Sequence, residues 1–562
     1  MKSSKQYLFL SIIGILFSAV YSRSIVKQDD YCIIFINNTY ALTSGNAKYQ
    51  KRQEPEQFVS TLLEEINELI IENKDTYQNP EVLEDKNSLR KRSDDDDLDY
   101  VSHISTIDDY SIAYAYLSYS LNEKIKKMDG IINCRPEEKV KVLNLNDLHK
   151  IDAKEYHGRR HSKRSDKKNL NSFINDIKEE TGWKGVEVRQ DVLSNLSLLS
   201  QGFYNDTKTI YDTNYYYPKS AGKDIDVYII DSGFNFRDSA FSNKSERTAK
   251  CIGYIKKYSD FTKIDTDYCV SNIFTEKIVG DHGEFTSNII GGIKEGVASK
   301  ANIYGFSLHC DDTLVGESLL YETFEYFATL KYRPNKSIIN LSLAFYSSIA
   351  NIELTKLTKK YLDVVVNKGV IIVSSAGNGV NYYEFGEPVI GEDYMILPCV
   401  FDNVICVGGI DNYGRDKKRY DSKEMITANY RKWSVSNYGK EVDIYAPVTG
   451  EYAMKNKNNK LEYRRFQGTS LSTALVSGVI ATIMGEHTDT KFDIKSMKAY
   501  LKKIGLNNVI SGIPEGPNLF INNGKHLVYG DDSTNVHNVD DSIDLPDEID
   551  SESESDNEEE EQ

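Results

Sequence analysis

Short runs of aliphatic and β-branched residues recur through the second half of the chain, separated by segments with helical spacing. Four of these runs contain consecutive apolar residues rather than an alternating pattern: 224–230, 338–340, 369–375 and 403–409. Strands that are apolar on both faces are typical of parallel sheets covered by helices on both sides. The pattern predicts an α/β fold with a doubly wound, mostly parallel sheet. In such folds chemistry lies beyond the carboxyl ends of the strands, so the polar residues after these runs are the candidates for function.

The N-terminal part of the chain has a different pattern, which predicts a small α+β unit. A β-like run over 32–36 precedes a helical stretch over 56–74 with apolar residues on one face. Residues 110–143 then read as strand, helix, turn and strand. The apolar residues of the helical face are Phe58, Leu62, Ile66 and Ile70.

Two charged stretches interrupt and follow this unit. Residues 87–99 place a basic block beside an acidic one, which is typical of an exposed, protease-sensitive loop. Residues 157–169 contain the dibasic pair Lys163-Arg164 and read as a linker. We take Arg92 and Arg164 as candidate processing positions, although dibasic pairs in linkers are often only solvated charge.

The N-terminus has the pattern of a secretory signal over 1–22. Lys2 and Lys5 precede an apolar run over 7–20, and small residues follow it. A membrane anchor is the weaker alternative, because the run is short for a bilayer and no later window is long enough to span one. We expect a secreted, soluble protein without a membrane span, located outside the cell or in a vacuole or other secretory compartment.

The net charge of −17 comes almost entirely from one terminal segment. Residues 531–562 hold 15 Asp or Glu and no Lys or Arg, which leaves 70 acidic against 68 basic residues in the rest of the chain. Because acidic and basic residues are nearly equal in number outside this segment, the composition argues against a nucleic-acid partner, which would require a basic surface. The acidic segment is predicted to be disordered.

The seven cysteines permit disulfides in a secreted chain, but their odd number and irregular spacing leave the pairing open. The sequence has no paired CxxC motifs and no HExxH helix, so no metal site is predicted. Five sequons are weak candidates for glycosylation. They begin at Asn37, Asn195, Asn205, Asn243 and Asn335.

Four polar residues lie at the ends of the predicted strands or at the starts of predicted helices, where catalytic or binding groups are expected. Asp231 ends the first apolar run, and Asn378 follows the third. His282 opens a small-residue run that suits a helix, and Ser470 begins another after Gly468-Thr469. Each signal is weak alone, because an aspartate at a strand end is more often a cap and a lone histidine is usually structural. Together, in the order Asp, His, Asn, Ser, they form a specific constellation.

The frames around these residues resemble the motifs of the subtilisin-like serine protease family. DSG (231–233), HGEFTS (282–287), AGN (376–378) and GTSLS (468–472) match its D-[ST]-G, H-G-T-x-x-[AS], A-G-N and G-T-S-x-[AS] motifs. The order Asp, His, Ser is that of subtilisin. Fragments 340–345 and 435–447 also resemble family segments, and the resemblance covers about 190 to 510.

The resemblance implies a secreted serine endopeptidase with protein or peptide substrates. Ser470 would be the nucleophile, His282 the general base, Asp231 its orienting carboxylate and Asn378 the oxyanion donor. No cofactor would be required, calcium is conceivable as a structural ion with unnamed ligands, and we expect a monomer. The substrate-binding residues would be Ser342, Leu343, Ala344, Ser375, Ala376 and Gly377.

Residues 23–143, and 121–138 above all, resemble the family's inhibitor-type propeptide. The resemblance therefore implies a zymogen, in which the propeptide is an intramolecular inhibitor that is cut away between Arg164 and Gln190. The expected organisation has five parts: signal 1–22, propeptide domain 23–143 with its loop at 87–99, linker 144–190, catalytic domain 191–525 and acidic tail 526–562.

Several family positions are changed, which suggests slow or narrow activity. They are Glu284 and Asn288 after the histidine, Ala474 and Leu475 after the nucleophile, Asp238, and the pair Ala344-Phe345. Two alternatives therefore remain: a pseudoprotease that binds peptides, and a secreted interaction protein that uses its acidic tail. A kexin-like processing enzyme is disfavoured, because residues 511–530 are too few for a further β-rich domain.

Overall fold

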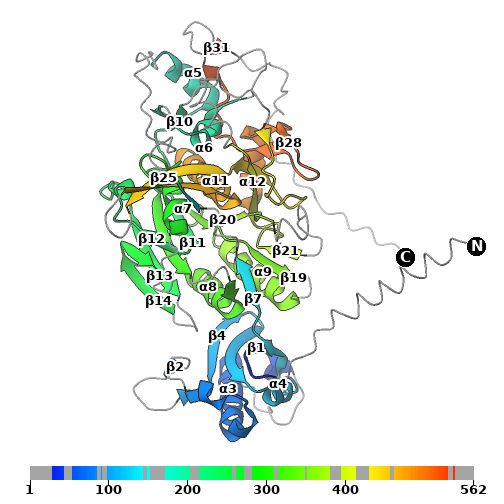
Figure 1. Cartoon of the computed structure of the whole chain (residues 1–562). Helices are drawn as coiled ribbons and strands as arrows, with labels where there is room; N and C mark the ends of the chain where they lie inside the picture. The colour runs from blue at the N-terminus through cyan, green and yellow to red at the C-terminus, as the bar shows by residue number, and fades with distance from the viewer. Residues whose placement is uncertain are drawn as a thin grey trace, which may run out of the picture.

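The computed structural model describes most of the chain between residues 28 and 537. Figure 1 shows a small N-terminal unit, coloured blue, beside a larger body that contains the rest of the elements. The described residues are 28–43, 54–84, 90–91, 98–142, 148–151, 171–190, 192–202, 214–255, 261–270, 281–308, 314–348, 351–379, 394–412, 430–455, 461–529 and 536–537.

The larger body is built on a ten-stranded sheet in the order β14-β13-β16-β11-β18-β20-β22-β24-β29-β27. Neighbouring strands from β13 to β29 are parallel, whereas β14 and β27 at the two edges are antiparallel to their neighbours. The strands are β11 (Asp226–Asp231), β13 (Ala249–Ile255), β14 (Phe261–Thr266), β16 (Asn302–Leu308), β18 (Ser337–Leu341), β20 (Val370–Ser375), β22 (Ile405–Ile410), β24 (Ile444–Pro447), β27 (Leu506–Asn507) and β29 (Leu519–Phe520).

Helices cover both faces of this sheet, which explains why its strands are continuously apolar. Along β11, Val227 and Ile229 join one buried cluster, while Tyr228 and Ile230 join the other. The first cluster includes residues of α7, α11 and α12, and the second includes residues of α8 and α9. The predicted doubly wound α/β fold is therefore confirmed. These helices are α7 (Asp281–Gly291), α8 (Glu317–Thr329), α9 (Ile352–Asn367), α11 (Thr469–Glu486) and α12 (Ile494–Ile504).

Helix α11 lies at the centre of the body, and all of its residues are buried. It is the one helix of the described residues that is long and apolar enough to cross a membrane. Its small residues permit close packing. A Cβ atom at Gly478 would lie 2.5 Å from Val297 Cβ, so the backbones approach closely at this point.

The N-terminal unit is a four-stranded antiparallel sheet in the order β4-β5-β1-β6, with helices on one face. The predicted helical face is confirmed, because Phe58, Leu62, Ile66 and Ile70 are all buried in α3. The elements are β1 (Asp30–Asn37), α2 (Tyr40–Thr43), α3 (Pro55–Glu72), β4 (Val101–Ile107), β5 (Tyr110–Leu117), α4 (Tyr119–Ile125) and β6 (Ile131–Pro136).

The stretch 144–190, predicted as a linker, contains three elements: β8 (Leu148–Ile151), α5 (Asn171–Thr181) and β9 (Val186–Arg189). The other described elements, apart from short 3-10 turns, are small. They are β2 (Arg90–Lys91), β3 (Leu98–Asp99), β7 (Lys139–Val142), α6 (Ser194–Ser197), β10 (Tyr215–Pro218), β12 (Gly233–Asn235), β15 (Tyr268–Val270), β17 (Leu314–Gly316), β19 (Phe345–Ser348), β21 (Tyr394–Leu397), β23 (Tyr430–Arg431), β25 (Thr449–Lys455), β26 (Leu461–Gln467), β28 (Ile510–Ser511), β30 (Val528–Tyr529) and β31 (Val536–His537).

Two disulfides resolve part of the cysteine pairing. Cys251–Cys269 joins β13 to β15, and Cys399–Cys406 joins the segment before β22 to the second residue of that strand. Cys32 and Cys134 are free and buried in the N-terminal unit. Cys310 lies outside the described residues, as do the predicted signal, Arg92, Arg164, Asn205 and residues 538–562 of the tail.

Candidate active site

Asp231 and His282 form a buried pair at the carboxyl end of the central strand. His282 Nδ1 lies 2.6 Å from Asp231 Oδ1, and both residues are at most 1% exposed. Because the carboxylate can only accept, Nδ1 donates, and in the neutral imidazole the lone pair is then on Nε2. This tautomer leaves Nε2 able to take a proton, as a general base must.

Two further donors hold the Asp231 carboxylate in place. The Ser232 N–H donates to Oδ1 at 2.7 Å, and Thr286 Oγ1 donates to Oδ2 at 3.0 Å. Sequence reasoning missed Thr286. The signal was its position four residues after His282, which places both side chains on the same face of α7.

Ser470 is the second residue of α11, so its hydroxyl lies at the positive end of a long helix. Its Oγ donates to the Ser342 carbonyl oxygen at 2.7 Å, and within the part of the chain that the structure describes no hydrogen bond joins it to His282. The His282 ring packs at 5.2 Å on Phe466, four residues before Ser470. A hydrogen bond from Ser470 Oγ to His282 would therefore require a different rotamer of Ser470.

Asn378 lies directly beside α11, the helix that carries Ser470. Its Oδ1 accepts from the Thr469 N–H at 3.0 Å and from Thr469 Oγ1 at 2.7 Å. These bonds fix which end of the amide faces the helix, because the oxygen is turned to Thr469 and the NH₂ group is turned away. An oxyanion donor needs this orientation.

Asn437 supports the backbone on either side of Asn378. Its Nδ2 donates to the Ala376 carbonyl at 2.8 Å, and its Oδ1 accepts from Gly379 N at 3.2 Å. Gly377 has a φ of 96°, and a Cβ there would lie 2.7 Å from Asn437 Nδ2. The loop therefore requires glycine at 377, and Asn437 was not predicted as part of the site.

The first predicted substrate-binding segment is hydrogen-bonded to the helix. Ser342 Oγ donates to the Ser470 carbonyl and accepts from Asn340 Nδ2, both at 2.9 Å. Ser477 Oγ in turn donates to Asn340 Oδ1 at 2.9 Å. This network joins the end of β18 to α11.

Both predicted substrate-binding segments follow neighbouring parallel strands. Residues 342–344 come after β18, and Ser375 ends β20. All the side chains in these segments that the structure describes are buried. Both segments therefore lie at the carboxyl end of the parallel strands, where Asp231 also lies.

Four of the changed family positions have a clear structural setting. Asp238 accepts from Ala240 N at 2.8 Å and caps a short 3-10 turn. Ala474 and Leu475 are fully buried in the core around α11. Phe345 is 2% exposed, and its ring packs edge-on to Phe324.

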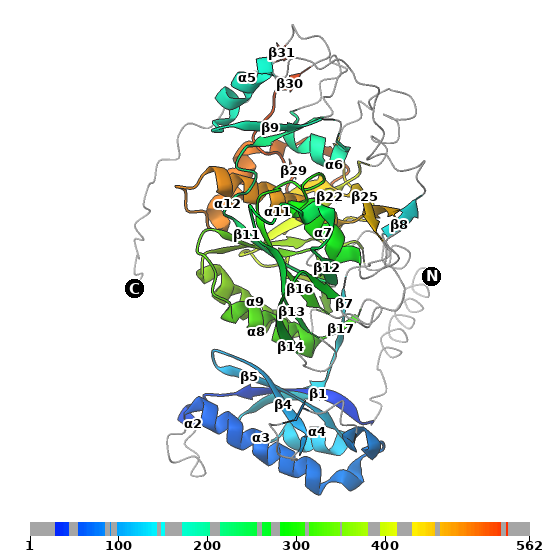
Figure 2. The same ribbon diagram turned by 90° about the vertical axis from the view of Figure 1, so that its left-hand side faces the viewer.

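A strand from the N-terminal part of the chain lies between two strands beside the site. β7 pairs antiparallel with β17 on one side and with β19 on the other, giving the order β17-β7-β19-β21. Val142 is opposite Phe345, and Val140 is 4% exposed within the core cluster of the larger body. Figure 2 shows β7 extending from the N-terminal unit into the larger body.

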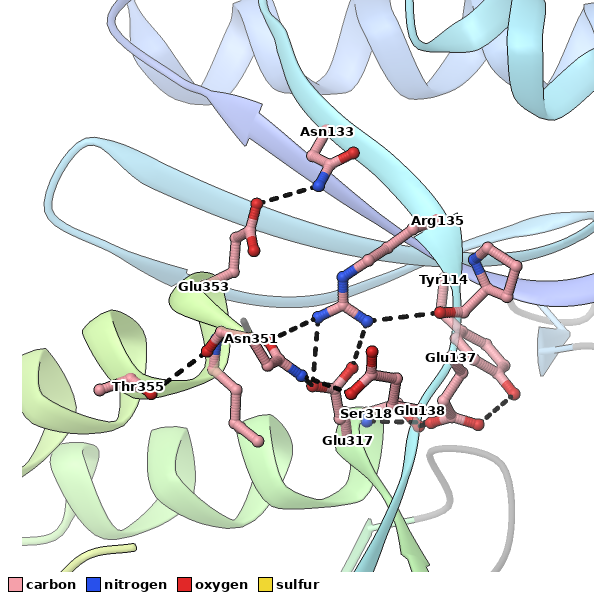
Figure 3. Close-up of polar contacts among 12 residues, drawn as sticks. Tyr114, Asn133, Arg135, Glu137, Glu138, Glu317, Ser318, Asn351, Glu353 and Thr355 are labelled. Carbon is pink, nitrogen blue, oxygen red and sulfur yellow. Dashed lines mark hydrogen bonds and ion pairs between the residues drawn. The ribbon is translucent and has the colours of Figure 1, made fainter. Parts of the chain in front are cut away.

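Polar contacts fix the N-terminal unit on the larger body (Figure 3). Arg135 donates to both oxygens of Glu317, at 2.7 and 3.1 Å, and to Asn351 Oδ1 at 3.1 Å. The Glu317 side chain is fully buried, and this burial raises its pKa while the bonds from Arg135 oppose the rise. Glu137 also accepts from the Ser318 N–H at 3.0 Å.

The described residues contain no group of three or more His, Cys, Asp or Glu side chains able to hold a metal ion. One cluster of backbone carbonyl oxygens accepts hydrogen bonds from the ammonium group of Lys432. Lys432 is 4% exposed, and its Nζ donates to the carbonyls of Trp433 at 3.0 Å and Ser436 at 3.0 Å.

Of the described sequons, Asn195 is 3% exposed, so a glycan does not fit there.

Residues 222–509 match the model of the subtilase family. The chain belongs to the subtilase family, whose members are serine-type peptidases. It is 24% identical over 328 residues to subtilisin-like proteinase Mp1 of Magnaporthiopsis poae, an alignment that covers 57% of this chain and 67% of that protein.

Other relatives agree with this assignment. Subtilisin-like protease 1 of Pseudogymnoascus destructans is 27% identical over 280 residues, covering 50% of this chain and 56% of that protein. Fervidolysin from Fervidobacterium pennivorans, a keratinolytic enzyme related to subtilisin, shares the fold with a TM-score of 0.50 and 14% identity, over 90% of this chain and 61% of that one. The chain spans little more than half of several curated relatives that it matches.

Proposed function

We propose that this protein is a secreted serine endopeptidase of the subtilisin type that is made as a zymogen. The observation that carries the proposal is the short Asp231–His282 contact at the end of β11, with Ser470 at the start of α11 beside Asn378. The two disulfides support an oxidising, secretory location.

The proposed mechanism uses these groups in two half-reactions. Ser470 Oγ attacks the substrate carbonyl carbon while His282 Nε2 takes its proton, and Asp231 stabilises the imidazolium. The oxyanion accepts hydrogen bonds from Asn378 Nδ2 and from the Ser470 N–H. His282 then gives its proton to the leaving amine, the C–N bond breaks and an acyl-enzyme forms. Water, activated by His282, releases the acid and restores Ser470.

We also propose that residues 23–143 are the intramolecular inhibitor. Strand β7 supports this role, because it pairs with strands on both sides as an extended substrate would. Release of this unit by a cut between Arg164 and Gln190 stays a prediction. Cleavage at Arg92 or Arg164 remains a separate prediction, as does a structural calcium ion without named ligands.

The experiment compares the wild-type chain with Ser470→Ala after expression through a secretory pathway. Intact mass spectrometry of the wild type should show a shortened chain, whereas Ser470→Ala should keep the N-terminal unit. Equal processing in both would contradict self-cleavage. Failure of the purified wild type to hydrolyse peptides or to react with a fluorophosphonate would contradict the protease function itself.

A further inference from the structure

The turn that follows β23 is built around the buried ammonium group of Lys432. Its Nζ donates to the carbonyls of Trp433 at 3.0 Å, Ser434 at 3.4 Å and Ser436 at 3.0 Å. An ammonium group has three N–H donors and no acceptor, so its donors match these three carbonyls in number. The Nζ atom also lies 5.3 Å from the centre of the Tyr438 ring, where the face of the ring attracts a cation.

This turn is joined to the loop that carries Asn378. Asn378 and Ser436 form an isolated antiparallel bridge. The next residue, Asn437, donates its backbone N–H to the Gly377 carbonyl at 3.0 Å. Its side chain bonds to the same loop on either side of Asn378. The carbonyl that Lys432 binds at position 436 is therefore adjacent to the residue that holds the loop of the proposed oxyanion donor.

The two ends of the turn are fixed on the central sheet, whereas its carbonyls converge on the ammonium group. The Trp433 N–H donates to the Gly409 carbonyl at 2.9 Å, and the Gly409 N–H donates to Ser436 Oγ at 2.9 Å. Carbonyl dipoles that are directed at one point repel one another unless a positive charge lies there. Buried carbonyl oxygens that lose a donor also cost free energy. The positive charge of Lys432 therefore stabilises this shape of the turn.

We propose that Lys432 is a positioning residue for the oxyanion site, because its ammonium group holds the turn 433–437 in the shape that places Asn378. The inference rests on the proposed protease function and adds a residue to its site. Without the cation, the turn relieves the repulsion by rotating its carbonyls away from one another. Ser436 and Asn437 then shift, and Asn378 shifts with them. Lys432 thus acts through Asn378 and makes no contact of its own with the substrate.

The first test separates an effect on kcat from an effect on KM. Lys432→Met keeps an apolar stem of similar length but removes the charge and the three donors. In the processed enzyme it should lower kcat on a peptide substrate by about tenfold to a hundredfold, with KM within about twofold, because the oxyanion forms only after attack on the carbonyl. A kcat within about twofold of the wild type, or a loss confined to KM, would overturn the proposal.

A matched control is available in the same segment of the chain. The Lys440 side chain is 88% exposed, so Lys440→Met removes a lysine charge close in sequence without changing the buried turn. This variant should keep the kcat of the wild type. An equal loss of kcat in Lys440→Met and Lys432→Met would overturn the proposal, because the effect would then follow from net charge alone.

Chemical rescue tests the ammonium group itself. Lys432→Ala lacks three methylene groups and the ammonium group, which together correspond to n-propylammonium. Added n-propylammonium should raise the kcat of Lys432→Ala by about tenfold in a saturable manner and leave Lys432→Met unchanged, because the methionine side chain fills the space. The uncharged 1-propanol should not restore kcat. Equal activation by both compounds, or no activation by n-propylammonium, would overturn the proposal.

A second measurement does not depend on activity and uses the uncut Ser470→Ala chain. The Asn437 N–H donates to the Gly377 carbonyl, so its hydrogen exchange reports whether the turn stays on the loop. Adding Lys432→Met should raise this exchange by about tenfold or more, while the amides of β11 stay protected. Unchanged exchange would overturn the proposal.

The two measurements distinguish failure of this inference from failure of the proposed function. Faster exchange at Asn437, together with no hydrolysis of any peptide by the wild type, would support the role of Lys432 in the turn and contradict the protease function. Unchanged exchange and unchanged kcat in Lys432→Met would overturn the inference and leave the protease function standing.

Discussion

Substitution of Asn378 tests the catalytic assignment through a single side-chain amide. Its oxygen accepts hydrogen bonds from the Thr469 N–H and hydroxyl, so its NH₂ group is at the opposite end of the amide. We expect Asn378→Ala to lower kcat by about a hundredfold to a thousandfold, as loss of one oxyanion donor does, with little change in KM. Steady-state kinetics on a peptide substrate would measure both.

Thr469 provides a matched control for this prediction. Thr469→Ser keeps the hydroxyl and the backbone N–H that bind Asn378 Oδ1, so it should retain most of the activity. A loss of less than tenfold in Asn378→Ala would exclude the residue as a principal oxyanion donor. A rise in KM with unchanged kcat would instead indicate a role in ground-state binding.

The four candidate catalytic residues were predictable because each follows a strand or begins a helix. The residues that position them were not. Thr286 and Asn437 act through side-chain direction and through contacts between segments that are distant in sequence. The spacing of Thr286 from His282 indicates a shared helix face but names no partner, and the loop position of Asn437 gives no sign of its contacts before the fold is known.

At the level of elements, four of the parallel strands, β11, β18, β20 and β22, were predicted to within one or two residues. Their apolar runs exist because both faces are buried, so local pattern and tertiary setting agree. Strand β8 and the β25–β26 hairpin were not predicted. Their sequences are rich in charged residues, and β8 pairs with a strand about 300 residues further along the chain. Long-range edge pairing has no local signal.

Substitution of Gly478 tests how closely α11 packs against Val297. A Cβ at this position would meet Val297 Cβ at 2.5 Å, which is far inside van der Waals contact. Gly478→Ala should therefore lower the free energy of unfolding by about 1–3 kcal/mol, despite the better helix propensity of alanine. Denaturant unfolding of the Ser470→Ala chain would measure the change without self-digestion.

A compensating substitution checks the cause of this loss. Val297→Ala removes the methyl groups that the new Cβ would meet, so it should cost less in the Gly478→Ala background than alone. Additive effects of the two substitutions would show that the contact between residues 478 and 297 is not the source of the strain.

At the scale of the whole molecule, one buried ion pair joins the N-terminal unit to the larger body. Glu317 is fully buried, and Arg135 is the one basic side chain among the described residues that forms an ion pair with it. Removing one partner of a buried pair leaves an uncompensated charge, which costs about 3–5 kcal/mol. Arg135→Met should therefore open this interface. Within the Ser470→Ala chain, protection of the Ser318 amide, which donates to Glu137 across the interface, should fall by about a hundredfold or more.

The pH dependence of the interface opening in Arg135→Met should show whether the Glu317 carboxylate is responsible for it. Burial raises the pKa of Glu317 in the closed interface, and Arg135 opposes the rise, so the pKa should be higher still in Arg135→Met. A carboxyl with a raised pKa stabilises the closed form at low pH, and this contribution is lost as the pH rises through the raised value. Protection of Ser318 in the variant should therefore be greatest in acid and should fall steeply towards neutral pH. The double variant Arg135→Met/Glu317→Leu, which has no buried charge, should recover protection and lose this dependence. Equal pH profiles for the single and double variants would contradict the role of Glu317.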